Sequence, residues 1–174
     1  MQPIYHEPHI SSFNILSDSW QTAWLRRLWP LWIVFAAWLL TENFGFSVNL
    51  THSLPHKVWL IHLKALPKHG DYVLFEAPSS AKVPKETTVI KQALGIPKDR
   101  VTRVGQDFFI NDHYVATAKK KSLTGELLIP GPDGVLAEGQ YYVSTPHPDS
   151  FDSRYQKMGW ISQSQIIGVA YPIW

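Results

Sequence analysis

The sequence predicts a mainly β fold, in which an antiparallel β domain follows one N-terminal transmembrane helix. Residues 1–50 contain only five of the 30 charged side chains and five of the eight tryptophans, so an apolar segment comes first. Beyond residue 50, short runs of β-branched and aromatic residues alternate with turn-forming residues, a pattern typical of short strands. We therefore expect the chain to divide near residue 50.

The expected anchor is centred on residues 28–40, a run of thirteen uncharged and mostly apolar residues. A helix needs ~20 mainly apolar residues to span a bilayer, and apolar residues on both sides extend this run to 24–48. Arg26 and Arg27 precede the run, which favours a cytoplasmic N-terminus. A cleaved signal peptide or an interfacial helix would share these features, but no small-residue cleavage site follows Leu40. The expected organisation is a short cytoplasmic segment over residues 1–23, a transmembrane anchor over 24–48 and a globular domain over 49–174.

The globular domain is expected to consist of short antiparallel strands. The segment 108–115 has the form of a hairpin with Asn111 and Asp112 at its tip. No long helical period follows residue 50, and the sequence contains no internal repeat. The runs expected to form strands are 58–62, 72–75, 87–91, 108–110, 141–143 and 166–171.

Composition excludes several kinds of chemistry. The chain has no cysteine, which rules out disulfides, thiolate metal sites and cysteine nucleophiles. Its eight histidines are scattered without paired spacing, and no glycine-rich phosphate loop is present, so we expect neither a metal nor another cofactor. A net charge of +2 is too small to indicate a nucleic-acid partner.

Ser53 stands just beyond the expected membrane exit, within the sequence Ser53-Leu54-Pro55. A serine before an apolar residue and proline is common in loops, so this tripeptide alone does not indicate catalysis. His52 lies next to Ser53, but a strand-like backbone would point its ring away from the serine hydroxyl. Residues 49–51 match a glycosylation sequon, although their overlap with the end of the anchor argues against that use.

Lys91 lies in the run expected to form a strand at 87–91. Strand alternation would put Val89, Lys91 and Ala93 on one face, so the lysine shares its face with small apolar side chains. Burial disfavours an ammonium ion, and a lysine with a lowered pKa can take a proton from a serine hydroxyl. A lysine that extends to solvent from a sheet edge would show the same alternation, which taken alone favours that alternative.

A third polar segment covers residues 147–155 and interleaves hydroxyls with charges. Asp152 and Arg154 are spaced so that they could form an ion pair within a compact loop. A surface turn with a weak ion pair would have the same composition, and is the simpler interpretation of this segment in isolation.

In combination, the three segments resemble the type I signal peptidases, and more closely the TraF-like peptidases of conjugative transfer, which mature and cyclise pilins. The resemblance runs from Phe44 to Trp174 and includes the anchor before it. The motifs that carry it are Ser53-Leu54-Pro55, Lys91 followed by Gly95-Ile96-Pro97-Lys98-Asp99, and Ser150 with Asp152, Arg154 and Tyr155.

The resemblance implies a role for each of these residues. Ser53 would be the nucleophile and Lys91 its general base, a dyad known as a variant of the serine triad. The hydroxyl of Thr51 and the backbone N–H of Ser53 would form the oxyanion hole. Ser150 would orient Lys91. The remaining two residues would form a supporting pair, Asp152 with Arg154.

The resemblance also implies a setting. The chain would be a single-pass protein of the bacterial inner membrane, with its catalytic domain in the periplasm and a propilin as substrate. Other components of a conjugative pilus assembly system would be partners. Its departures from the common signal peptidase pattern point to a specialised enzyme: Leu54 replaces a methionine, residues 144–149 replace a Gly-Asp-Asn run, and only about 25 residues, 116–140, are free for an inserted subdomain.

Two alternatives stay open at this point. The first is a general type I signal peptidase, which hydrolyses the signal peptides of exported proteins. The second is a catalytically silent, membrane-anchored β module that serves in the assembly of a secretion machine. Cyclisation of the pilin, as opposed to hydrolysis, rests on the resemblance alone.

Overall fold

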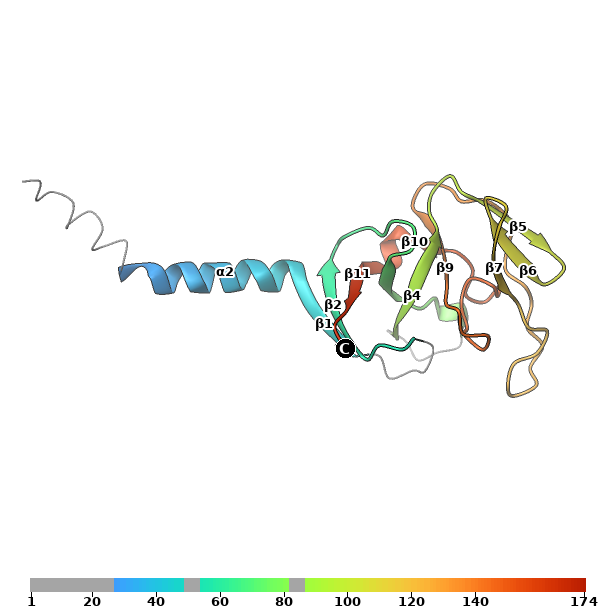
Figure 1. Ribbon diagram of the computed structural model, residues 1–174, viewed down its shortest axis with the longest axis horizontal. Helices are drawn as coiled ribbons and strands as arrows, with labels where there is room; N and C mark the ends of the chain where they lie inside the picture. Colours follow the sequence, from blue (N-terminus) through green and yellow to red (C-terminus); the bar gives the residue numbers. More distant parts are fainter. Residues whose placement is uncertain (1–26, 49–53, 82–86) are drawn as a thin grey trace, which may run out of the picture. The chain divides into compact units, whose positions relative to one another are not determined.

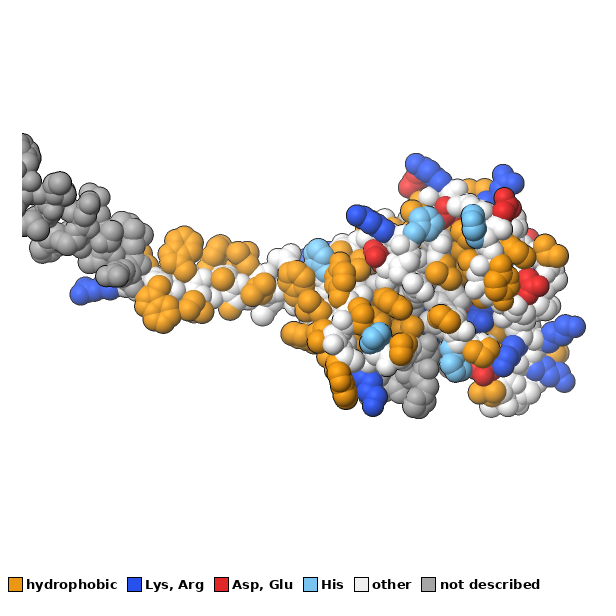
Figure 2. Space-filling model, in the orientation of Figure 1, with side chains coloured by type: hydrophobic (Ala, Val, Ile, Leu, Met, Phe, Trp, Pro, Cys, Tyr) orange, Lys and Arg blue, Asp and Glu red, His pale blue; other side chains and the backbone are white. Residues whose placement is uncertain are grey.

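The computed structural model describes residues 27–48, 54–81 and 87–174 (Figure 1). It divides into two units, Met1–Leu40 and Thr41–Trp174. The single described α-helix, α2, spans Trp29–Asn43, and Pro30 occupies its first turn, where a missing N–H is tolerated. None of its side chains is buried, and Figure 2 shows them as an apolar surface. Within the described ranges, no helix combines the length and the hydropathy that crossing a membrane requires.

The expected anchor over 24–48 differs from the structure at its C-terminal end. Its first three residues lie outside the described residues, and its last five form strand β1 (Phe44–Val48). In that strand Phe44, Phe46 and Val48 alternate with smaller residues, and β1 pairs with the antiparallel neighbour β2 from Phe44↔His62 to Val48↔Val58. A period of two therefore replaces the helical period at residue 44.

The larger sheet has seven strands in the order β1-β2-β11-β3-β4-β9-β10, and every neighbouring pair is antiparallel. Besides β1, its strands are β2 (Val58–Leu63), β3 (Tyr72–Glu76), β4 (Thr88–Gly95), β9 (Gln140–Ser144), β10 (Ile161–Ser162) and β11 (Ile166–Pro172). Two short 3₁₀ turns, η1 (Ser79–Ala81) and η2 (Gln163–Gln165), lie in the connections.

A second, four-stranded antiparallel sheet follows β4 in the chain and has the order β7-β6-β5-β8. Its strands are β5 (Arg100–Val104), β6 (Asp107–Ile110), β7 (His113–Thr117) and β8 (Gly134–Val135). The predicted hairpin is confirmed, because β6 and β7 are joined by Asn111 and Asp112 with φ of 48° and 67°. Both values lie in the left-handed region that a two-residue type I′ turn requires.

The prediction of a mainly β, antiparallel domain is confirmed, and each of the six runs expected to form strands lies in a strand or overlaps one. Two apolar clusters enclose the strand β4 from its two faces. Val89 and Ala93 pack into one of them, and Ile90 belongs to the other. Both faces of β4 are therefore covered by apolar side chains, so a residue of this strand is in the protein interior on either face.

Candidate active site

Lys91 is buried on an interior strand. In the sheet, β4 has β3 on one side and β9 followed by β10 on the other, so it is not an edge strand. Lys91 is only 5% exposed, and across the strand pair it faces Val73, which packs in the same apolar cluster as Val89 and Ala93. The alternative of a lysine that reaches solvent from a sheet edge is therefore wrong.

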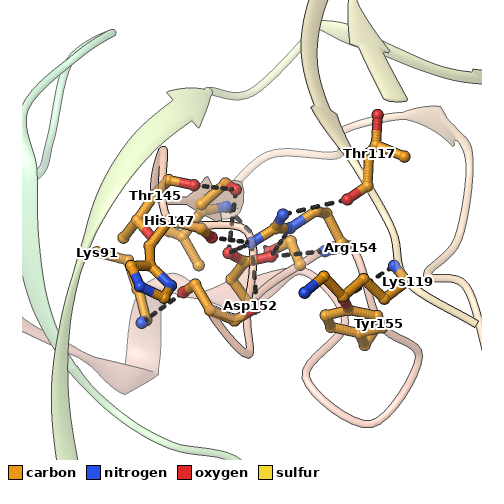
Figure 3. Close-up of polar contacts among 12 residues, drawn as sticks. Lys91, Thr117, Lys119, Thr145, His147, Asp152, Arg154 and Tyr155 are labelled. Atoms are coloured by element: carbon orange, nitrogen blue, oxygen red, sulfur yellow. Dashed lines mark hydrogen bonds and ion pairs between the residues drawn. The ribbon is translucent and has the colours of Figure 1, made fainter. Parts of the chain in front are cut away.

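The Lys91 ammonium is directed at the 147–155 segment (Figure 3). Its Nζ donates a hydrogen bond of 2.8 Å to Ser150 Oγ, and Ser150 is itself buried. Burial lowers the pKa of Lys91 from 10.5 to about 8; the charge of Asp152 opposes this shift, and the charge of Arg154 adds to it. A lysine with this pKa is partly neutral near neutral pH, so it can accept a proton from an alcohol.

Asp152 and Arg154 form a buried bidentate ion pair. Arg154 Nε lies 2.8 Å from Asp152 Oδ1, and Arg154 Nη2 lies 2.8 Å from Asp152 Oδ2. Asp152 is 0% exposed and Arg154 is 2% exposed. The carboxylate also accepts hydrogen bonds from Ser144 Oγ at 3.1 Å and from the Arg154 backbone N–H at 3.2 Å. The alternative of a surface turn with a weak ion pair is therefore wrong.

The guanidinium of Arg154 also holds the backbone of the turn that carries Ser150. Its Nη2 donates to the carbonyl oxygens of His147 and Ser150, each at 3.0 Å, and its Nη1 donates to the carbonyl of Thr117 at 3.2 Å. Burial alone would lower the pKa of Arg154, but the hydrogen bond and charge of Asp152 raise it, so the side chain stays cationic. Arg154 thus fixes the position of Ser150 relative to β7.

The segment is anchored on both sides by backbone contacts. Ser153 N–H donates to Val143 O at 3.0 Å, and Val143 N–H donates to Ser153 Oγ at 2.9 Å, which joins the segment to β9. On the other side, Gly131 N–H donates to Arg154 O at 2.7 Å. A Cβ at Gly131 would lie 2.3 Å from Ser153 O, so only glycine fits without a backbone shift.

Gly131→Ala is expected to destabilise the fold by about 1–3 kcal/mol, because the methyl group would push the 150–155 segment away from its position. Urea unfolding measures the change. Gly45→Ala is the matched control, since the nearest atom to its added Cβ is Leu63 Cδ2 at 3.8 Å, an ordinary contact. Equal free energies of unfolding for the two variants would show that the 150–155 segment can move to accommodate the methyl group without loss of stability.

Ser53 and Thr51 lie outside the described residues, so their roles stay predictions. The first described residue after them is Leu54, which is 6% exposed and belongs to the same buried cluster as Ile90, the residue before Lys91 on β4. The structure brings together the four other predicted residues, which are Lys91, Ser150, Asp152 and Arg154.

Four groups that complete the arrangement were not predicted from the sequence. They are the hydroxyls of Ser144 and Ser153 and the carbonyl oxygens of Thr117 and His147. Ser144 ends an apolar strand run just before the 147–155 segment, and from that position a contact between its hydroxyl and the segment could have been predicted. The contacts of Thr117 and His147 with Arg154 use only backbone oxygens, so their side chains carried no signal.

The serine that contacts Lys91 among the described residues is Ser150, the residue predicted to orient the lysine. The family model described as "Signal peptidase, peptidase S26" matches residues 21–174, so the chain belongs to the signal peptidase S26 family.

The "Conjugal transfer protein TraF" of Agrobacterium fabrum (strain C58 / ATCC 33970) is 26% identical over an alignment of 147 residues, and the match covers 74% of this chain and 82% of that protein. The crystal structure of a signal peptidase I from Enterococcus faecalis V583 is 23% identical, with a TM-score of 0.39, and the match covers 60% of this chain and 96% of that chain.

Proposed function

We propose that this chain is a membrane-anchored serine endopeptidase of a conjugative transfer system, which cleaves a C-terminal tail from a propilin through an acyl-enzyme on Ser53 and joins the new end to the pilin's own N-terminus. The observation that carries the proposal is the burial of Lys91, which lowers the pKa of its ammonium group. An ammonium group buried on an interior strand destabilises a fold, and use as a general base accounts for its presence there.

Ser53 lies outside the described residues, so its pairing with Lys91 is proposed from the motifs that both residues share with the signal peptidase family. Leu54, the first described residue after it, packs with Ile90 on the face of β4 opposite to the one that carries Lys91.

In the proposed reaction the Ser53 hydroxyl attacks the scissile carbonyl carbon while its proton passes to neutral Lys91. The hydrogen bond to Ser150 orients Nζ for this transfer, and the Asp152–Arg154 pair holds Ser150 in place. The tetrahedral oxyanion would be stabilised by the Ser53 N–H and the Thr51 hydroxyl. When the carbon–nitrogen bond breaks, the Lys91 ammonium returns the proton to the leaving amine, and an ester on Ser53 remains.

The second step decides the product. Attack on the ester by the pilin's N-terminal amine would form a peptide bond and a ring, whereas attack by water would give a linear chain. The relative that is named a conjugal transfer protein supports the conjugative setting, and the pilin substrate is proposed from the resemblance of the motifs. A general signal peptidase, which releases exported proteins by hydrolysis, is the second candidate and is supported by the family model.

The proposal includes an inner-membrane location, with the N-terminus in the cytoplasm and the peptidase domain in the periplasm. The exposed apolar side chains of α2 support an anchor in this region. They include Trp29, Trp32, Val34, Trp38 and Leu40, each at least 55% exposed. Water solvates such a surface poorly, and a lipid environment would bury it. Pilus assembly components in the same membrane would be the partners.

The test is to express the full chain in bacteria together with a candidate propilin and to weigh the mature pilin by mass spectrometry. We expect a product that lacks the C-terminal tail and is lighter than the hydrolysed chain by one water, which is the mass of a ring. Ser53→Ala should leave the propilin unprocessed, whereas Ser79→Ala, at an exposed serine of η1, should process it normally. Normal maturation by Ser53→Ala would disprove the nucleophile, and a linear product would disprove cyclisation.

A further inference from the structure

A pocket of about 210 Å³ opens beside the segment that holds Lys91 in place. Its lining comes from two parts of the chain, 119–128 and 149–155. Pockets for drug-sized ligands usually enclose ~300–1,000 Å³. This volume is therefore suited to one or two side chains of a larger molecule.

One wall of the pocket is rigid. Phe151 and Tyr155 stack with their ring centroids 5.6 Å apart and an interplanar angle of 4°. Tyr155 is 3% exposed, and its hydroxyl accepts a hydrogen bond of 3.1 Å from Lys119 N–H. The same wall includes Ser150, whose Oγ accepts the hydrogen bond from Lys91. The pocket therefore adjoins the proposed catalytic lysine through one residue.

The other part of the lining is a small hairpin. Lys121 and Leu127 form an antiparallel bridge, Ser122 N–H donates to Glu126 O at 2.8 Å, and Leu128 N–H donates to Lys120 O at 3.0 Å. These contacts hold the backbone of 120–128 in a defined shape. At its tip Leu123 is 85% exposed although it lines the pocket. An exposed leucine at the rim of an otherwise ordered pocket is available to an apolar ligand group.

The charges of the lining favour an acidic partner. Lys119 Nζ is paired with the carboxylate of Asp149, so these two charges compensate each other. Lys121 also lines the pocket, and no carboxylate of the described residues forms an ion pair with it. The pocket thus combines apolar walls with one uncompensated positive charge.

We infer that this pocket is a substrate subsite, which takes an apolar side chain of the bound peptide while an adjacent acidic residue of the peptide faces Lys121. The inference rests on the proposed peptidase function and adds a specificity determinant to it. Apolar contact with Leu123, Leu128 and Phe151 supplies the affinity. The exposed lysine supplies selectivity, which salt will weaken because the charge is at the rim.

The test is cleavage profiling with the full chain in detergent micelles. The probe is an equimolar library of synthetic 14-residue peptides in which every pair of residue types occurs at short spacings, and mass spectrometry identifies the bonds cut. Wild type should prefer an apolar residue beside an acidic one at a fixed distance from the cut. Lys121→Glu should lower the rate for those peptides about 3- to 10-fold and favour a basic residue at the acidic position. Leu123→Ser should weaken the apolar preference.

Lys120→Glu is the matched control, because it makes the same charge change at the adjacent exposed position, which does not line the pocket. It should leave the acidic preference in place. Cleavage that depends on Ser53 but shows the same profile in Lys121→Glu as in wild type would overturn the subsite and leave the peptidase standing. Absence of any Ser53-dependent cleavage by wild type would instead overturn the peptidase, and the subsite with it.

Discussion

Lys91→Met is expected to lower kcat/KM by about 10⁴-fold or more, since no other group on β4 could take the proton of the nucleophile. In the wild type, kcat/KM should rise about tenfold per pH unit below pH 8 and level off above it, because only the neutral lysine is a base. A peptide identified as a substrate, assayed from pH 6 to pH 10, measures both effects. A profile that is flat across pH 8 would argue against Lys91 as the base.

Lys91→Met is expected to raise the free energy of unfolding at neutral pH, although it lowers activity. The pKa of Lys91 is about 8 in the folded chain and 10.5 when unperturbed, so between these values the unfolded chain binds a proton that the folded chain does not. The free energy of unfolding of the wild type should therefore rise with pH across this window. Below pH 8 Lys91 is charged in the folded chain, and its destabilising effect is complete. Relative to Lys91→Met, the free energy of unfolding of wild type should increase by about 2–3 kcal/mol from pH 7 to pH 10.

Urea unfolding of both proteins at pH 7 and pH 10 measures this change. Lys120→Met is the control, because Lys120 is exposed and its replacement should shift stability equally at the two pH values. If wild type and Lys91→Met differ by the same amount at pH 7 and pH 10, Lys91 is not held in a destabilised charged state. A loss of activity without this pH signature would then indicate a structural role for the lysine.

The strands were predictable from the sequence where they contain continuous apolar runs. Strand β1 was not, because its alternating residues continue directly from an apolar helix and were included in the expected anchor. Strand β5 was missed since Arg100 and Arg103 interrupt its apolar residues, and β8 and β10 have two residues each. Such strands are defined by their partners in the sheet, which a local pattern does not contain.

The candidate site was predictable in its residue types but not in its burial. Alternation along β4 is the same whether the strand is central or at an edge, so the depth of Lys91 depends on β9 and β10, some 50 or more residues further along the chain. Likewise, Asp152 and Arg154 could be paired by their spacing. Only the contact of Arg154 with Thr117, 37 residues away, shows that the pair organises a fixed turn.

Arg154→Met should destabilise the fold by about 3–5 kcal/mol, because it would leave the carboxylate of Asp152 buried without its cation. It would also free the carbonyl oxygens of His147 and Ser150. Ser150 would then no longer hold Lys91, so cleavage should be lost together with stability. Unfolding in urea and a peptide cleavage assay, performed on the same preparation, measure the two effects.

A double-mutant cycle separates the pair from its surroundings. Asp152→Asn removes the carboxylate charge that is unpaired when Arg154 is replaced by Met. The loss of stability in the double variant should therefore be smaller than the sum of the losses in the two single variants, by about 1–3 kcal/mol. Glu138→Gln provides the comparison at an exposed ion pair, in which Lys98 and Glu138 lie 3.3 Å apart and are 84% and 76% exposed. That substitution should change stability by less than about 1 kcal/mol. Strict additivity at Asp152 and Arg154 would mean that the two side chains do not stabilise the turn as a unit, and that Ser150 is positioned by its own backbone contacts.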